Sequence, residues 1–260
     1  SYAEADAAFR DRSPEAASLF RRYADANPDN AWGHYMLGLS LRREGDPDRA
    51  ETAFLKALEL DPDHVKSLVN VSRALLDQDR AEEALPFIEK AVALETGVPA
   101  PHRVHGRVLH TLGRRTEAVD AYAAALAIDP DDAWSLNNTG LLLIEEEAFA
   151  DAAERLARAV ELDSTVATFR NNLGVALERS GRYREAELAY SGAVGLDAGY
   201  DKARVSLARV TELVETGTPA DPAPLLAAAS LATASPNVGS EGGSEAGSEE
   251  IPEPTDEIRP

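Results

Sequence analysis

Apolar and small residues recur about one helical turn apart along residues 31–64, in two runs separated by a polar break. The residues of this pattern are Leu37, Gly38, Leu41, Ala50, Phe54 and Ala57. Such spacing puts each run on one face of a helix. Gly45-Asp46-Pro47 ends the first predicted helix and begins the second, and Asp61-Pro62 ends the second. The pattern predicts a helical hairpin in which the small residues let the two helices cross closely.

The same pattern returns without a slip over 31–64, 65–98, 99–132, 133–166 and 167–200. Its tight position holds Gly38, Ser72, Gly106, Gly140 and Gly174, and its large position holds Phe54, Ile88, Tyr122, Leu156 and Tyr190. One hairpin cannot bury its apolar face alone, so such units stack on copies of themselves. Asp79 and Glu147 replace the glycine between the helices in two repeats, which loosens those turns without changing the predicted fold.

The two ends of the array differ from the repeats between them. Residues 1–30 read as a truncated repeat, with a helix over Tyr2–Arg12 and a helix start at Ser13-Pro14-Glu15. Residues 201–215 read as one more first helix without a partner. Its charged outer side suits a solvated capping helix and carries Lys202, Arg204, Arg209, Glu212 and Glu215.

The composition changes near residue 216, which divides the predicted chain into a repeat domain over 1–215 and a tail over 216–260. Gly, Ser, Glu and Pro dominate residues 235–260, which predicts a segment that is disordered or bound to a partner. Only Arg259 opposes the tail's carboxylates, which are Asp221, Glu241, Glu245, Glu249, Glu250, Glu253, Asp256 and Glu257. The tail is therefore strongly acidic.

Charge and composition narrow the function. The chain of 260 residues carries 26 Lys and Arg against 46 Asp and Glu, a formal net charge of −20. This argues against binding to nucleic acid or to an anionic membrane surface, and no apolar run is long enough for membrane insertion. Because there is no cysteine, thiol catalysis and cysteine metal sites are excluded. The chain begins at Ser1 rather than Met. If a leader was removed, a secreted or cell-surface location is favoured, and otherwise the compartment stays open.

The repeated residues resemble the tetratricopeptide-repeat family over roughly residues 1–215. The resemblance implies an all-α, right-handed superhelical solenoid of helical hairpins, here one truncated repeat, five full repeats and a capping helix. It also implies that the first helices line a concave groove and that partners are extended peptides or helices of other proteins. The fold by itself does not assign a function.

Helical periodicity turns one set of first-helix residues toward this groove, and the set is rich in basic and amide side chains. Those that we expect to bind a peptide are Arg42, Lys66, Asn70, Arg73, Arg103, Arg107, Asn137, Asn138, Asn171, Asn172 and Arg179. The basic residues outnumber the inward acids, which are Asp77, Glu145, Glu178 and Glu212. Carboxamides can donate to a peptide carbonyl and accept from its N–H. The asparagines resemble the ladder of O-linked N-acetylglucosamine transferases and, less well, the arginines resemble the carboxylate clamp of chaperone-tail adaptors.

Simpler interpretations exist for each of these features. The asparagines can cap or bridge neighbouring hairpins, and the arginines can pair with glutamates of the next helix. Trp32 and Trp134 share one repeat position, which favours packing between repeats over stacking on a ligand. His102 and His105 lie one turn apart, but no carboxylate pair flanks them. Core or rim packing is therefore favoured over a metal site.

No nucleophile triad and no phosphate-binding glycine loop occurs in the sequence, so we predict neither an enzyme nor a cofactor. The first hypothesis is a scaffold that binds an extended, acidic peptide in its groove, and the chain's own tail fits that description in cis or in trans. One alternative is a self-assembling structural protein that forms head-to-tail filaments, extracellular and glycosylated if a leader was present. Another is the non-catalytic, peptide-presenting part of a larger assembly.

Overall fold

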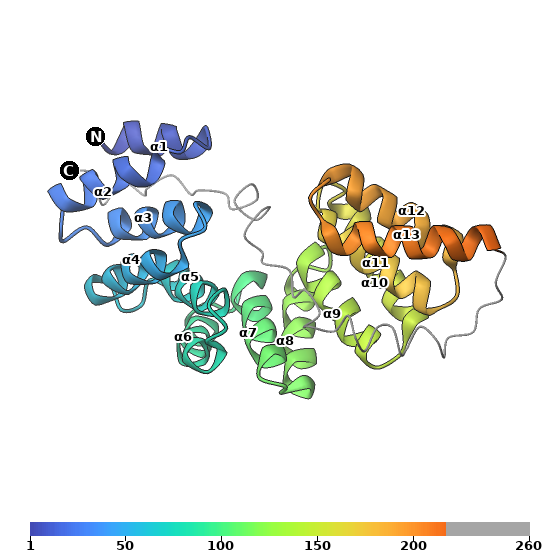
Figure 1. Ribbon diagram of the computed structural model, residues 1–260. Helices are drawn as coiled ribbons and strands as arrows, with labels where there is room; N and C mark the ends of the chain where they lie inside the picture. The colour runs from blue at the N-terminus through green and yellow to red at the C-terminus, as the bar shows by residue number, and fades with distance from the viewer. Residues whose placement is uncertain (217–260) are drawn as a thin grey trace. The chain divides into compact units, whose positions relative to one another are not determined.

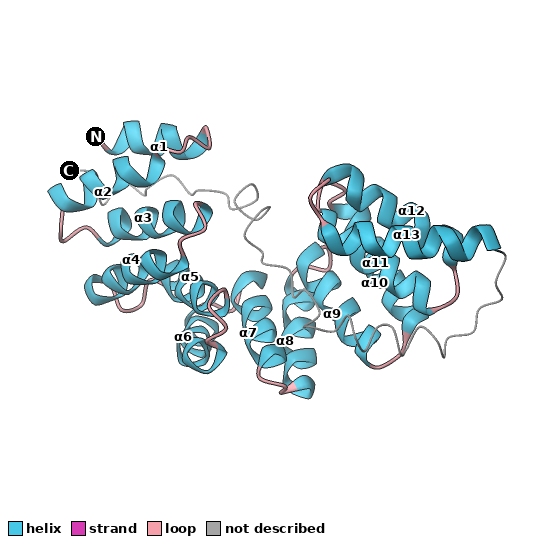
Figure 2. Cartoon of the chain, viewed as in Figure 1, coloured by secondary structure: helices cyan, strands magenta, loops and turns pink. Residues whose placement is uncertain are grey.

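The computed structural model describes residues 1–216, which form thirteen α-helices and no strand (Figures 1 and 2). These residues divide into two compact units, 1–78 and 79–216. The first unit holds α1 (Tyr2–Arg10), α2 (Ala16–Ala26), α3 (Ala31–Arg43), α4 (Pro47–Leu60) and α5 (Val65–Leu76). The second holds α6 (Ala81–Leu94), α7 (Pro99–Thr111), α8 (Arg115–Ile128), α9 (Ala133–Glu145), α10 (Phe149–Leu162), α11 (Ala167–Arg179), α12 (Tyr183–Leu196) and α13 (Asp201–Thr216). Within each unit, helices that follow one another in the chain pack side by side (Figure 1).

The helix boundaries keep one register from residue 31 onward. First helices begin at residues 31, 65, 99, 133, 167 and 201, and second helices begin at 47, 81, 115, 149 and 183. The predicted all-α fold of repeated hairpins is confirmed. The chain therefore places residues of equal repeat position at equivalent points on successive helices, which is the property that builds the site described below.

The close crossing of the two helices in a hairpin depends on the predicted small residue. A Cβ atom built on Gly106 would lie 2.6 Å from Tyr122 Cε1, and one on Gly174 would lie 2.6 Å from Tyr190 Cε1. Both tyrosines are almost fully buried. Since neither ring has room to retreat, only glycine fits at these crossings.

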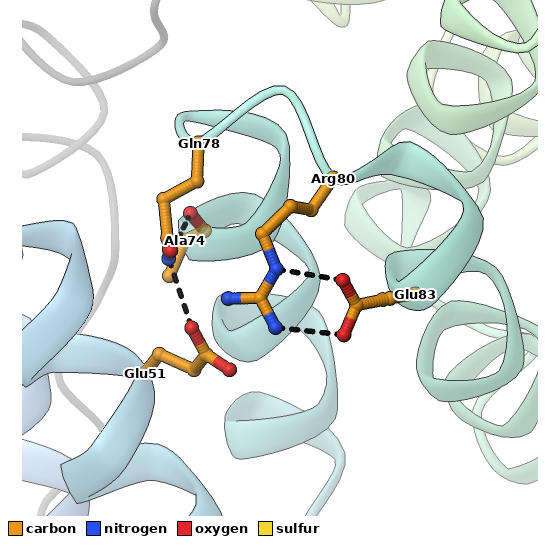
Figure 3. Close-up of polar contacts among 5 residues, drawn as sticks. All are labelled: Glu51, Ala74, Gln78, Arg80 and Glu83. Carbon is orange, nitrogen blue, oxygen red and sulfur yellow. Dashed lines mark hydrogen bonds and ion pairs between the residues drawn. The ribbon is translucent and has the colours of Figure 1, made fainter.

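Polar contacts secure the ends of the helices. Arg80 precedes α6, and its Nε and Nη2 each lie 2.7 Å from a carboxylate oxygen of Glu83 (Figure 3). The second unit repeats this pairing before α8 and α12, through Arg114–Glu117 and Arg182–Glu185. In the first unit, Gln78 Nε2 donates to the Ala74 carbonyl (3.0 Å) and to Glu51 Oε2 (2.9 Å), which ties the end of α5 to α4 (Figure 3).

The turns inside the hairpins need a residue with positive φ. Gly45, Gly113 and Gly181 supply it with φ between 73° and 79°, where glycine carries no steric penalty. The two predicted exceptions take the same conformation without glycine, Asp79 at φ 57° and Glu147 at φ 60°. These turns are therefore strained rather than loosened, because an L-residue with a Cβ is disfavoured there.

Replacing Glu147 by Gly is expected to stabilise the second unit by about 1 kcal/mol, because the side chain no longer opposes the left-handed backbone. The measurement is urea unfolding followed by circular dichroism. The matched control is Gly181→Ala, at the same turn of the next repeat, which should destabilise by a similar amount. A Glu147→Gly protein less stable than its parent would contradict the assignment of strain.

The amino-terminal repeat departs from the prediction at its turn. The first helix ends at Arg10 instead of Arg12, since Arg12 has a positive φ of 53°. The next helix begins at Ala16 and not at the predicted proline, because Ser13 Oγ accepts from Glu15 N in a tight turn before the helix. The shortened α1 is nevertheless anchored to α3, because Trp32 Nε1 donates to the hydroxyl of Tyr2 at 2.8 Å.

At the carboxyl end, α13 buries Ala203 and Val210, while Leu207 and Val214 pack against the apolar cluster between α11 and α12. Four of its five predicted surface charges are exposed, but Arg209 is only partly so and turns toward α11. The predicted tail, with its acidic stretch, lies outside the described residues. Among the helices of residues 1–216, none combines the length and apolar character that crossing a membrane requires.

Candidate functional site

Four asparagines on α9 and α11 form a connected row of side-chain amides. Asn171 Nδ2 donates to Asn172 Oδ1 at 3.3 Å, Asn172 Nδ2 donates to Asn137 Oδ1 at 2.9 Å, and Asn137 Nδ2 donates to Asn138 Oδ1 at 3.1 Å. All four side chains are buried. The predicted asparagines thus come together, and they bond to one another across neighbouring first helices. We call them the amide row.

On α7, the two predicted arginines are also buried. Arg103 Nη1 lies 2.6 Å from Asp132 Oδ1, and the other oxygen of Asp132 accepts from Ser135 Oγ. Arg107, one turn further along α7, is only 4% exposed. Asp132 is not among the predicted residues, because it precedes α9 and lies outside the first helix. A buried guanidinium needs a carboxylate partner. This requirement is the signal in the sequence that could have pointed to Asp132.

A second buried carboxylate holds the end of the array. Glu178 is 3% exposed and accepts two bonds from Arg209, from Nε and Nη2, each at 2.8 Å. It also accepts from the hydroxyl of Tyr190 at 2.7 Å. Burial and the adjacent Glu178 carboxylate raise the pKa of Tyr190 well above its ordinary value, and the bonds to Glu178 raise the pKa of Arg209. Helices α11, α12 and α13 therefore meet at one neutralised charge cluster.

Three more charged side chains on the first helices of the second unit have described contacts. His110 Nε2 lies 2.9 Å from Glu145 Oε1, and the other Glu145 oxygen pairs with Arg115. The guanidinium of Arg179 stands 4.9 Å from the centre of the Phe149 ring, a cation–π geometry. Of the cations predicted to make the groove positive in this unit, Arg103 and Arg209 are thus each paired with a buried carboxylate.

The predicted residues of the first unit form a separate group. Arg42 Nε pairs with Asp77 Oδ2 at 3.2 Å. Asn70 Nδ2 donates to the Lys66 carbonyl at 2.9 Å, and Arg73 Nη1 donates to Asn70 Oδ1 at 3.4 Å. Asn70 shares its repeat position with Asn138 and Asn172, yet its amide bonds within its own helix and does not reach across to another.

Aromatic rings lie beside this group in the first unit. The ring of Trp32 lies 5.2 Å from that of Tyr35, and the ring of Tyr35 lies 5.1 Å from that of His64. Burial lowers the pKa of His64. In the second unit, Trp134 packs edge-on against Phe169 at 4.7 Å. Trp32 also contacts Lys66 of the next repeat, whose Nζ lies 5.8 Å from the indole ring, so both tryptophans contact side chains of adjoining repeats.

The histidines singled out in the sequence lie on α7. Burial is the main cause that lowers the pKa of His102 and of His105, so both favour the neutral form. Nowhere in residues 1–216 do three or more His, Asp or Glu side chains gather in a way that could hold a metal ion.

Two models of protein families match the repeated hairpins of this chain. A family model described as a tetratricopeptide repeat matches residues 35–99 and 137–201, and a second, described as a TPR repeat, matches residues 106–146. The matches coincide with the hairpins of both units.

Three individual proteins show how far the similarity extends. Anaphase-promoting complex subunit 7 of Mus musculus is 32% identical over 108 residues, which is 41% of this chain and 19% of that protein. Protein O-mannosyl-transferase Tmtc3 of Drosophila melanogaster is 27% identical over 132 residues, 48% of this chain and 14% of that protein. The crystal structure of the APC/C hetero-tetramer Cut9–Hcn1 superposes with a TM-score of 0.74 at 17% identity, over 82% of this chain and 42% of that one. The chain thus spans less than a fifth of these two curated relatives.

Proposed function

We propose, from the premise that this chain belongs to the tetratricopeptide-repeat family, that it is a non-enzymatic scaffold whose first helices bind an extended, acidic segment of a protein partner. Binding protein partners is the role that the family membership supports. The finer proposal rests on one observation: α7, α9 and α11 place buried amides and guanidiniums in adjoining repeats, beside hairpin cores that are mainly apolar.

The partner segment is proposed to be extended because the contacts available to it follow the repeats. Successive first helices lie about 8–10 Å apart, so only a stretched chain can visit several of them in turn. Amides suit this task, because they can pair with any peptide backbone and read little of its sequence. The relatives' names are consistent with assembly, since one is a complex subunit and one structure is a hetero-tetramer.

The acidic character of the segment depends on fewer residues than the sequence indicated. Arg42, Arg103 and Arg209 each have a carboxylate partner in the structure. The described contact of Arg179 on α11 is instead a cation–π contact with the Phe149 ring. We therefore assign the charge preference to Arg179. The affinity comes mainly from backbone contacts, and charge adds selectivity.

Selection from a phage-displayed library of random peptides tests the proposal on the full chain. We expect enrichment of Asp- and Glu-containing peptides that bind with a dissociation constant on the order of 1 μM and more weakly in high salt. Arg179→Gln should reduce the affinity several-fold, because it removes one cation from the first-helix surface. The matched control is Arg158→Gln on the second helix α10, whose guanidinium pairs with exposed Asp131 and Glu161; this change should leave binding intact.

Two outcomes of the selection would count against the proposal. If no peptide is enriched, the chain does not bind extended segments. If the enriched peptides carry no excess of acids, the charge preference is wrong while the binding mode stands. A synthetic peptide of residues 239–260 serves as a second probe, and competition between it and the selected peptides tests whether the chain's own tail is an occupant.

A specific observation favours one second candidate, the peptide-presenting part of a larger assembly. The match to Tmtc3 covers 48% of this chain but only 14% of a protein named as a transferase. Under this alternative the same surface presents a substrate segment instead of retaining a partner. Selected peptides that dissociate in milliseconds favour presentation, and residence times of seconds or longer favour a stable scaffold.

A further inference from the structure

Helix α13 is a first helix for which the described residues hold no second helix. It starts at Asp201, in register with the earlier first helices, so Ala208 occupies the tight position of the hairpin crossing. In the five full repeats the residues at this position are all buried, and they are Gly38, Ser72, Gly106, Gly140 and Gly174. Ala208, by contrast, is exposed. One face of α13 is therefore open at the place where each full repeat is covered by its own second helix.

The first full repeat shows what packs on this face in a complete hairpin. A Cβ atom built on Gly38 would lie 2.5 Å from Cε1 of Phe54, the large residue of the second helix. The ring of Tyr35, which precedes Gly38 by less than a helical turn, lies 6.0 Å from the Phe54 ring. The residues of α13 in register with Tyr35 and Gly38 are Val205 and Ala208, and Val205 is 62% exposed. These two residues form a small apolar face that fits one large side chain.

A short segment after α13, which lies outside the described residues, has the residue spacing of a second helix. In α4 this spacing joins Pro47, Ala50, Phe54 and Ala57, and the segment has Pro224, Ala227, Leu231 and Ala234 at the same intervals. Pro47 is the first residue of α4, a position that proline favours. Leucine also holds the large position of the fourth full repeat, as Leu156. Pro236 follows soon after the segment and marks the end of the predicted helix.

We propose that residues 224–234 form a second helix that packs on α13 of the same chain and places Leu231 against Val205 and Ala208. Seven residues lie between Thr216 and Pro224, whereas three join the two helices of the first full repeat, so the connection is long enough. The segment contains no charged residue, so docking carries no charge into an apolar contact. The repeat domain then ends near residue 234 instead of 215, and the acidic stretch begins after it.

Two residues of α13 differ from most other first helices, and both are compatible with a covering helix. Ala208 has a Cβ atom where four of the five repeats have glycine. Ser72 also has one and is fully buried in a complete hairpin, so the crossing can accommodate a Cβ atom. Arg204 is exposed on the same face. In the preceding repeat, Arg170 is in register with it and lies over α12, with its Cδ 3.1 Å from a Cβ built on Gly192. An arginine at this position therefore does not exclude a second helix.

The test is hydrogen exchange of the full chain, measured by mass spectrometry. A helix as short as residues 224–234 is marginal on its own in water, so protection of its amides reports packing and not intrinsic helicity. We expect these amides to exchange at least about tenfold more slowly than an unstructured peptide of the same sequence. Ala227→Glu, on the face toward α13, should return them to within about twofold of the unstructured rate. Ala208→Glu should do the same from the other side of the contact, and it should leave α13 folded because Ala208 is exposed.

The matched control is Ala229→Glu, which makes the same substitution two residues further along the segment. Its counterpart in α4, Thr52, is exposed, so protection should stay within about twofold of the parent. If residues 224–234 of the parent exchange at the unstructured rate, the proposal is wrong and α13 is the solvated end of the array. If their protection survives Ala208→Glu, the segment packs elsewhere, which also overturns the proposal.

A second copy of the chain is the competing source of the segment. If the segment packs on α13 of another molecule, its protection should rise with protein concentration, and sedimentation should show a matching increase in mass. That result overturns docking within one chain. Protection that stays constant over about a hundredfold range of concentration supports it. None of these measurements involves a bound peptide, so their outcome does not depend on the proposed function.

Discussion

Replacing Arg209 by Met is expected to release α13 from the second unit, at a cost of about 3–5 kcal/mol. The reason lies in Glu178, whose side chain is only 4% exposed and accepts two hydrogen bonds from the Arg209 guanidinium. Without the arginine, a buried carboxylate keeps a single described partner, the hydroxyl of Tyr190. Hydrogen exchange measured by mass spectrometry should show the amides of α13 losing protection before those of α11 and α12.

Two further variants test whether the unpaired charge of Glu178 causes the expected release of α13. Arg204→Met removes an arginine from the same helix, but its pair with Asp201 is well exposed, so the cost should be about 0–1 kcal/mol. Adding Glu178→Gln to Arg209→Met should recover much of the loss, because no buried charge is then left uncompensated. If α13 keeps its protection in Arg209→Met, this cluster does not hold the helix in place.

Truncating Phe169 to Ala is expected to destabilise the junction between the fourth and fifth full repeats by about 3–5 kcal/mol. The Phe169 side chain is fully buried and packs against Trp134, Leu136, Ala159 and Val166. The cavity would open directly beside the indole. The chain has two tryptophans, so in a Trp32→Phe background the fluorescence of Trp134 reports this junction alone. The emission should shift to longer wavelength, and the unfolding midpoint in urea should fall.

The control for Phe169 removes apolar volume from the surface. Leu188 on α12 is 73% exposed, and Leu188→Ala should change stability by no more than about 0.5 kcal/mol. Because stacked repeats can unfold in parts, the tryptophan signal and circular dichroism are compared in each variant. A Phe169→Ala protein with the parent's Trp134 emission would show that the two rings are not in contact in solution.

The repeat period predicted the helix boundaries well, because it depends on a local spacing of residues that recurs in every hairpin. The start of every helix from residue 31 onward follows from it, and so does the need for glycine at positions such as Gly106 and Gly174. The first repeat was less predictable. No feature of the sequence around Arg12 indicates its positive φ, which ends α1 early, and the Ser13–Glu15 turn delays the start of α2.

The pairing of inward side chains was predicted less well than their positions. Periodicity places Arg103 and Arg209 on first helices, but it does not say which carboxylate each one reaches. Asp132 lies just outside a helix and was not counted among the inward acids, so counting charges overstated the positive character of the surface. Glu178 was counted, but its pairing with Arg209 was not predicted. The direction of the hydrogen bonds in the amide row could not be predicted from the sequence either. It depends on how four adjacent amides orient together and not on any one of them.

The constant register has an evolutionary consequence. Unequal recombination that removed residues 133–166 would join α8 to α11 with every helix still in phase, and the shortened protein should fold. The contacts between inward side chains of neighbouring repeats would change, however. Asn171 and Asn172 would then stand one repeat after Arg103, in the places of Asn137 and Asn138, and Asn172 would lose the Asn137 oxygen that accepts its hydrogen bond. Whole repeats of this chain are interchangeable as scaffolding, whereas the identity of the surface depends on which repeats are neighbours.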